Sequence, residues 1–128
     1  MAENKRAVVL YLEDDSDLTN DLNKFFKLVG IDLLLATNKA EADEHLESAR
    51  PDAFLFDLEL DDGLNGFEVA VEYISNHEYS PSDFMFLTAW DKRFDRPEIF
   101  SKSSVFRKPA SPSLIAKTIH ESLKGKKE

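Results

Sequence analysis

The stretch that decides the fold is AFLFD, residues 53–57, in which four apolar residues precede an aspartate. An apolar run of this length, bounded by turn-forming residues, is typical of a strand that is buried on both faces of a sheet. Comparable runs occupy residues 8–12, 32–36 and 84–87, and a shorter one occupies residues 105–107. The chain is therefore expected to contain five strands.

Segments with helical periodicity separate these runs. The clearest follows Ser16, the expected N-cap, and ends at Gly30. Residues 91–103 leave room only for a short helix that starts near Pro97, because proline disrupts a helix interior. Strands that alternate with helices predict an α/β protein with a parallel sheet. The other expected helices are residues 40–49, 66–75 and 113–123.

Composition limits the classes of function. The 128 residues fit one domain, which we expect to span residues 1–128 without an output domain. A formal net charge of −9 disfavours nucleic acid and anionic membranes as partners, because both require a positive surface. Cysteine is absent, which excludes thiolate catalysis. The sequence shows neither a membrane span nor a secretory signal, and we expect a cytoplasmic protein.

Polar residues follow four of the expected strands. Glu13 and Asp14 follow the first, Asp57 ends the third, and Thr88 and Lys108 follow the fourth and fifth. In an open parallel sheet, functional groups gather beyond the carboxyl ends of the strands, so these side chains are expected to meet. Each residue alone has an ordinary interpretation, as Asp57 would have as a turn or cap residue. Their joint placement is what favours a site.

The set fits phosphoryl transfer to a carboxylate, which requires a nucleophile, a divalent cation and donors for the phosphoryl oxygens. Asp57 is the candidate nucleophile. Asp14 and Asp57 are candidate ligands of Mg²⁺, and Glu13 would hold a bound water, because Mg²⁺ takes few carboxylates directly. Lys108 and the hydroxyl of Thr88 are the candidate donors to the phosphoryl group.

The segments VVLYLEDDSDL, FLFDLEL, FLTAW and FRKP resemble, in this order, the four motif blocks of receiver domains from two-component response regulators. The resemblance covers nearly the whole chain. It implies a flavodoxin-like, doubly wound sheet of five parallel strands in the order 2-1-3-4-5. It also implies that Asp57 is the phosphoacceptor and that Thr88 carries the switch hydroxyl. The backbone carbonyl of Glu59 would be a further metal ligand, and the bond between Lys108 and Pro109 would be cis.

The implied function is acceptance of a phosphoryl group on Asp57 from a histidine kinase or a histidine phosphotransfer protein. A change of conformation that a partner protein reads would follow. Such a domain is a Mg²⁺-dependent phosphoprotein that catalyses its own phosphorylation, and it is not an enzyme with a separate substrate. We expect a monomer or a weak dimer.

Two features depart from the family pattern. Val105 stands where receivers commonly carry the aromatic residue of the switch, and strand alternation is expected to point Phe106 to the other face. Residues 91–104 are short for the output surface. Glu59 and Trp90 occupy the two positions that in receivers tune the access of water to the acyl phosphate.

Other functions fit the sequence less well than this one. A receiver-like interaction module that acts without phosphorylation stays open, and Val105 favours it. A phosphatase of the haloacid dehalogenase kind is disfavoured because its nucleophile lies in a D-x-D motif on the first strand. Flavodoxin is disfavoured because the acidic residues 13–17 would repel the phosphate of FMN. His120, in HESLKG, lacks the spacing of a phosphorylatable histidine, and His45 and His77 are expected on helix surfaces.

Overall fold

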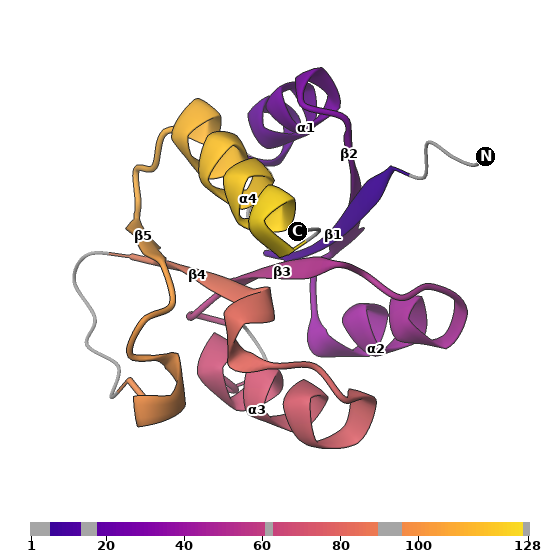
Figure 1. Ribbon diagram of the computed structural model, residues 1–128. Helices are drawn as coiled ribbons and strands as arrows, with labels where there is room; N and C mark the ends of the chain where they lie inside the picture. Colours follow the sequence, from indigo (N-terminus) through magenta and orange to yellow (C-terminus); the bar gives the residue numbers. More distant parts are fainter. Residues whose placement is uncertain (1–5, 14–17, 61–62, 90–95, 127–128) are drawn as a thin grey trace.

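The computed structural model describes residues 6–13, 18–60, 63–89 and 96–126, and strands and helices alternate along them (Figure 1). The α/β class predicted from the sequence is confirmed. The elements are β1 (Ala7–Leu12), α1 (Thr19–Leu28), β2 (Ile31–Ala36), α2 (Lys39–Ser48), β3 (Ala53–Asp57), α3 (Gly66–His77), the 3₁₀ turn η1 (Pro81–Asp83), β4 (Phe84–Thr88), the 3₁₀ turn η2 (Glu98–Phe100), β5 (Val105–Arg107) and α4 (Pro112–Lys126).

The strands form one parallel sheet in the order β2-β1-β3-β4-β5, which confirms the predicted order. Helices α1 and α4 cover one face of the sheet, and α2 and α3 cover the other (Figure 1). The strand order reverses between β1 and β3, so the crevice of a doubly wound fold lies beyond their carboxyl ends. The last residues of β1, β3, β4 and β5 are thereby brought to the same edge.

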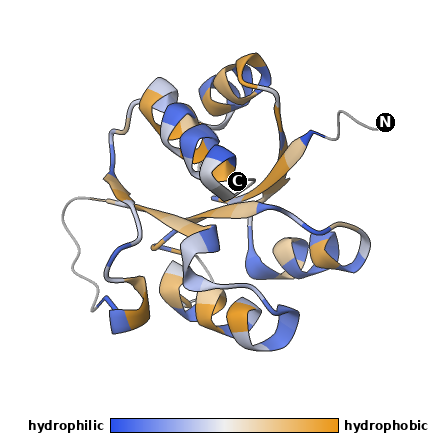
Figure 2. Cartoon of the chain, in the orientation of Figure 1, coloured by the Kyte–Doolittle hydropathy of each residue, from blue (hydrophilic) through white to orange (hydrophobic). Residues whose placement is uncertain are grey.

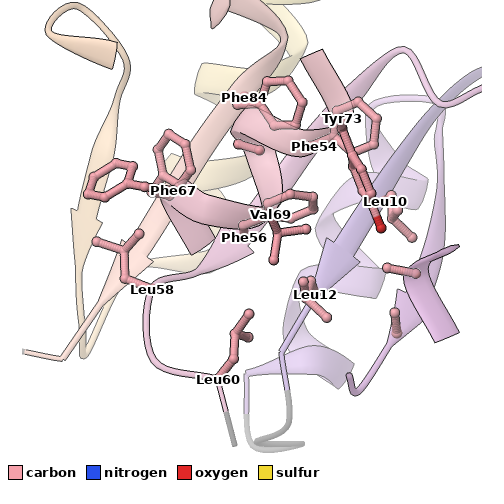
Figure 3. Packing of buried hydrophobic residues seen from close by; sticks show 14 of the residues in the cluster. Leu10, Leu12, Phe54, Phe56, Leu58, Leu60, Phe67, Val69, Tyr73 and Phe84 are labelled. Carbon is pink, nitrogen blue, oxygen red and sulfur yellow. The ribbon is translucent and has the colours of Figure 1, made fainter. Parts of the chain in front are cut away.

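Aromatic side chains fill the core between the sheet and helices α2 and α3 (Figure 3). Phe54 of β3 stacks on Phe84 of β4, with ring centroids 4.5 Å apart and ring planes at 11°. Phe100 of η2 is fully buried, and its ring centroid lies 5.0 Å from that of Phe86. Ring pairs of this kind add about 0.5–1.5 kcal/mol each beyond the burial of their area. We call the following residues the aromatic cluster: Phe54, Phe56, Phe67, Tyr73, Tyr79, Phe84, Phe86 and Phe100.

The opposite face of the sheet packs on α1 and α4. Successive residues of β1 alternate between the two layers, so that Leu10 and Leu12 pack with the aromatic cluster while Val9 and Tyr11 pack toward Phe26 of α1. Figure 2 shows strands that are apolar over most of their length beside helices with one polar and one apolar side. A sheet covered on both faces explains why its strands are unbroken apolar runs in the sequence.

The start of helix α3 and the end of helix α2 each have a local cause. Helix α3 begins with a capping box, in which the side chain of Asn65 accepts from the backbone of Glu68 and the side chain of Glu68 accepts from the backbone of Asn65. It continues to His77, two residues beyond the expected end. Helix α2 ends at Ser48, because Ala49 is already extended.

Two further expectations concern the ends of the first helix and the segment before β5. Gly30 follows α1 with φ of 80°, a conformation that favours glycine, as expected of a stop residue. Ser16, the expected N-cap, lies outside the described residues. A short helical turn does follow Pro97, namely η2.

Over the described part of the chain, no helix has both the length and the apolar character needed to span a bilayer.

Candidate functional site

Side chains from three separate strand ends meet at the carboxyl edge of the sheet. Glu13 follows β1, Asp57 ends β3, and Lys108 follows β5. The Nζ atom of Lys108 lies 3.1 Å from Oδ2 of Asp57 and 2.8 Å from Oε1 of Glu13. The structure therefore brings together three of the residues predicted from the sequence. Asp14, the other acidic residue of the expected site, lies outside the described residues.

Asp57 is buried and held at both carboxylate oxygens. The residue is 2% exposed. Its Oδ1 accepts a hydrogen bond of 3.0 Å from the backbone N–H of Glu59, and its Oδ2 accepts from Nζ of Lys108. The strand and the two hydrogen bonds fix one orientation for the carboxylate, which is what a nucleophile requires.

Lys108 is fixed through its backbone as well as its side chain. Its N–H donates to the carbonyl of Thr88 at 2.9 Å, next to the last paired residues of β4 and β5. The peptide bond from Lys108 to Pro109 is cis, as the resemblance implies. The ammonium group is thus carried to the site from the edge strand of the sheet, between two carboxylates that come from inner strands.

The electrostatics of the site are dominated by its two buried carboxylates. Burial raises the pKa of Glu13, the hydrogen bond that its protonated carboxyl donates to Asp57 raises it further, and Lys108 offsets only part of this, so that the pKa reaches about 8. Burial alone would lower the pKa of Lys108, but the hydrogen bond to Glu13 and the charge of Asp57 outweigh burial and raise it. The single positive charge of Lys108 is therefore too little to balance the negative charge of two ionised carboxylates.

This donor set fits a hard divalent cation. Glu13 and Asp57 offer carboxylate oxygens, and a second positive charge would relieve the crowding that raises the pKa of Glu13. Among the described residues, no group of three histidine, cysteine, aspartate or glutamate side chains is arranged to hold a metal. The predicted set includes Asp14, which lies outside those residues, and the backbone carbonyl of Glu59. The cation therefore stays a prediction.

Thr88 lies at the predicted place, half-buried at the end of β4. Its hydroxyl donates to the carbonyl of Ala89 at 3.0 Å. The backbone N–H of Ala89 donates in turn to Oε1 of Glu59 at 3.2 Å. The loop after β3 is thus tied to the loop after β4 across the edge of the sheet. Trp90, the other position expected to tune the access of water, lies outside the described residues.

Sequence reasoning missed the part played by Gly66, the first residue of α3. A Cβ atom added there would lie 2.6 Å from the carbonyl oxygen of Asp57 and 3.2 Å from its carbonyl carbon. Any larger residue would displace the backbone that carries the candidate nucleophile. The glycine in the segment NGFEV, directly after the acidic loop, was the available signal, because glycine is suited to places where the backbone is approached closely.

Val105 and Phe106 point to opposite layers of the molecule, as strand alternation predicts. Val105 packs against the aromatic cluster, and Phe106 packs against the layer that contains α1 and α4. The side chain of Phe106 therefore cannot replace the missing aromatic residue at position 105. On β5, Val105 pairs in register with Phe86, and Arg107 pairs with Thr88.

The three histidines lie on helices and are half-buried rather than fully exposed. The ring of His45 lies 2.8 Å from the carbonyl oxygen of Leu35, and the ring of His77 lies edge-on to that of Tyr73. These contacts give His45 and His77 a packing role. Neither contacts a residue of the candidate site in the part of the chain that the structure describes.

Comparison with solved structures defines the class of this fold. The receiver domain of a Francisella response regulator is 20% identical, has a TM-score of 0.76, and is matched over 94% of this chain and 98% of that one. A CheY-like receiver domain protein from Methanospirillum hungatei is 18% identical with a TM-score of 0.75, over 96% and 98% of the two chains. A receiver domain protein from Clostridium thermocellum is 17% identical with a TM-score of 0.74, over 94% and 97%. The chain has the fold of response-regulator receiver domains.

Comparison by sequence agrees with this class. The chain is 27% identical over 128 residues to the Phyllosphere-induced regulator PhyR of Methylorubrum extorquens, and the match covers 96% of this chain. It covers 46% of PhyR, so the chain spans about half the length of this curated relative. No protein-family model matches the chain. The resemblance predicted from the four motif blocks is confirmed at the level of the fold.

Proposed function

We propose that this chain is a response-regulator receiver that accepts a phosphoryl group on Asp57. The observation that carries the proposal is the position of Lys108, whose ammonium group lies 3.1 Å from a buried carboxylate at the carboxyl edge of a doubly wound sheet. A fixed nucleophile beside a fixed cation is what phosphoryl transfer requires, since that chemistry depends on positioning and electrostatic stabilisation.

The step itself involves one bond formed and one bond broken. An oxygen of the Asp57 carboxylate attacks the phosphorus of the donor, and the bond between phosphorus and the donor's leaving group breaks as the new O–P bond forms. The leaving group takes the electron pair, whether it is a histidine nitrogen or an acetate oxygen. The product is an acyl phosphate on Asp57.

The ammonium group of Lys108 would pair first with the carboxylates and then with the phosphoryl group. Before transfer its ammonium group pairs with both Glu13 and Asp57. After transfer Asp57 is part of a mixed anhydride, the acyl phosphate, and the negative charge lies on the phosphoryl oxygens, two bonds beyond the carboxylate oxygen. Because a lysine side chain is long and flexible, the same ammonium group can pair with a phosphoryl oxygen without movement of the backbone.

Mg²⁺ is part of the proposal. Asp14, Asp57 and the backbone carbonyl of Glu59 would hold it, with Glu13 acting through a water, and it would neutralise charge on the phosphoryl oxygens. Burial and the neighbouring carboxylate of Asp57, which together raise the pKa of Glu13, support a cation here.

Thr88 would couple the presence of the phosphoryl group to a change in the conformation of β4. Its hydroxyl now bonds to the carbonyl of Ala89, and a phosphoryl oxygen is a stronger acceptor because it is charged. Exchange of one acceptor for the other would move the end of β4. Val105 in the neighbouring strand offers no aromatic ring to follow this motion, so the output is proposed to run through the loops beside the site.

The proposed setting follows from the fold class. The phosphoryl donor would be a histidine kinase or a histidine phosphotransfer protein, and the reader of the signal would be another protein. We further propose a cytoplasmic monomer or weak dimer that carries out no turnover of a separate substrate. The relative PhyR is named a regulator, in keeping with a signalling role for the chain.

The proposal is tested by incubation of the chain with acetyl phosphate and Mg²⁺, followed by measurement of the intact mass. The chain should gain one phosphoryl group, and the gain should require Mg²⁺. The Asp57→Asn variant should gain none. The Asp83→Asn variant is a matched control, because Asp83 is a carboxylate on the capping turn η1, and it should be phosphorylated like the natural chain. An equal gain in Asp57→Asn would exclude Asp57 as the acceptor.

A module that acts without phosphorylation is the second candidate. The observation that favours it is the placement of Val105 and Phe106, which leaves the switch without an aromatic residue on the correct face. It predicts no mass gain in the experiment above. It also predicts that a partner binds the natural chain and the Asp57→Asn variant equally well.

A further inference from the structure

The hydrogen-bond donors beside Asp57 are already engaged by carboxylates of the protein. Within the described site, Nζ of Lys108 bonds to Glu13 and Asp57, and the N–H of Glu59 bonds to Asp57. The N–H of Ala89 bonds to Oε1 of Glu59. An incoming phosphoryl group needs several donors for its oxygens, so it competes with the acceptors that are already present.

The N–H of Ala89 is well placed for such an oxygen. Asp57 pairs in register with Leu87 on the neighbouring strand, and the backbone N–H of Leu58 donates to the carbonyl of Leu87 at 2.8 Å. Ala89 lies two residues farther in the direction in which both strands run. A phosphoryl group on Asp57 extends the side chain outward at this edge, toward the end of β4.

Glu59 is the acceptor that can most readily leave. The side chains of Glu13 and Asp57 are 1% and 3% exposed, whereas Glu59 is half-buried in the loop after β3. A carboxylate at the edge of the site can move into water at low cost, while a buried one cannot. Its departure would free the Ala89 N–H and remove a negative charge from the path of an anionic donor.

We propose that the carboxylate of Glu59 is a built-in competitor of the phosphoryl group for the N–H of Ala89. This inference rests on the proposed function and assigns a regulatory residue within the same site. Glu59 occupies the donor in the unmodified protein and slows phosphoryl acceptance. It also holds the loop after β3 against β4 until a phosphoryl group replaces it, so that its release is one of the structural changes that accompany phosphorylation.

A purely structural role for the same hydrogen bond makes the opposite prediction. If Glu59 only ties two loops together, its removal loosens the edge of the site and leaves phosphoryl acceptance unchanged or slower. If Glu59 competes, its removal frees a donor and makes acceptance faster. The direction of the change in rate therefore separates the two roles.

The test compares the natural chain with Glu59→Ala and Glu59→Gln. Both substitutions keep the backbone N–H that bonds to Asp57 and the backbone carbonyl proposed as a metal ligand. Each protein is incubated with acetyl phosphate at its own saturating Mg²⁺ concentration, and the rate of mass gain is measured. The ¹⁵N–¹H resonance of Ala89 is followed in the unmodified proteins. The control is Glu47→Ala, which removes an equal charge from an exposed position near the end of α2.

We expect Glu59→Ala to accept the phosphoryl group at least about tenfold faster than the natural chain, which is the order of effect of one hydrogen bond to a charged group. Glu59→Gln should lie between the two, because its neutral amide is a weaker acceptor. The Ala89 resonance should shift in both Glu59 variants and stay in place in Glu47→Ala.

Two results would overturn the inference, and they are distinguishable. If the natural chain is phosphorylated and Glu59→Ala is equally fast or slower, Glu59 does not compete, while the proposed function stands. If neither the natural chain nor any variant gains a phosphoryl group, the proposed function fails and the inference fails with it.

Discussion

Lys108 and Asp57 are joined by a hydrogen bond of 3.1 Å, although 51 residues separate them in the sequence. The bond links the edge strand β5 to the inner strand β3 at the carboxyl end of the sheet. The same ammonium group is 2.8 Å from Glu13, which follows β1. A single lysine therefore connects three strand ends, and its removal should affect both stability and chemistry.

Substitution of Lys108 by methionine should destabilise the cation-free protein by about 1–3 kcal/mol, because the buried Asp57 and Glu13 then lose their positively charged partner. Urea unfolding at neutral pH measures this loss. Lys117→Met, which removes an exposed lysine from α4, should change the free energy of unfolding by less than about 0.5 kcal/mol. Equal effects of the two substitutions would contradict the central position given to Lys108.

Stability without a cation should fall as the pH rises from about 4.5 to about 8, the pKa that Glu13 reaches in the folded protein. In this window the unfolded chain has released the proton of Glu13 while the folded chain retains it, so stability decreases with pH. The contribution is complete below the unfolded pKa and is lost as the pH passes the folded one. Urea midpoints at a series of pH values, for the natural chain and Glu13→Gln, measure the difference. Parallel pH profiles would contradict a raised pKa at Glu13.

Gly66→Ala should destabilise the fold by about 1–3 kcal/mol and slow phosphoryl acceptance, because the new Cβ would lie 2.6 Å from the Asp57 carbonyl. Gly125→Ala is the matched control. It lies in α4 with no atom within 4 Å of an added Cβ, and it should stabilise by up to about 1 kcal/mol. Thermal unfolding compares the two. If both alanines stabilise, the close approach of α3 to Asp57 is not a constraint.

Phe100→Ala should cost about 3–5 kcal/mol, because the ring is fully buried among Phe67, Phe84 and Phe86. Ile99→Ala, at the neighbouring position, should cost far less, since Ile99 is 52% exposed. Both values come from chemical denaturation. A small loss at Phe100 would mean that the segment before β5 does not contribute to the core as the structure indicates.

The meeting of Glu13, Asp57 and Lys108 could be predicted from the sequence for a physical reason, whereas the strand order was implied by the resemblance to receiver domains. Parallel strands that are buried on both faces are unbroken apolar runs, and the polar residue that ends each run must lie at the common edge. The cis bond before Pro109 was available only through the resemblance to receiver domains. The hydrogen bond between Ala89 and Glu59 could not be predicted, because it joins two loops whose conformations are not set by periodicity.

Gly66 and Phe100 illustrate the same limit. The importance of Gly66 depends on how closely α3 approaches the backbone of β3, which is a matter of tertiary packing. The sequence predicts that Phe100 lies in an irregular segment with one short helix. In the structure its ring completes the aromatic cluster. A local pattern shows which residues are apolar, but the partner that each ring meets depends on the folded chain.

The most direct test of the central claim locates the phosphoryl group on the chain. The protein is incubated with acetyl phosphate and Mg²⁺, treated with sodium borohydride, which reduces an aspartyl phosphate to homoserine, and digested for peptide mass analysis. We predict the characteristic mass decrease at position 57 alone, and none in a sample that received no phosphodonor. Reduction at another aspartate, or at none, would contradict the account.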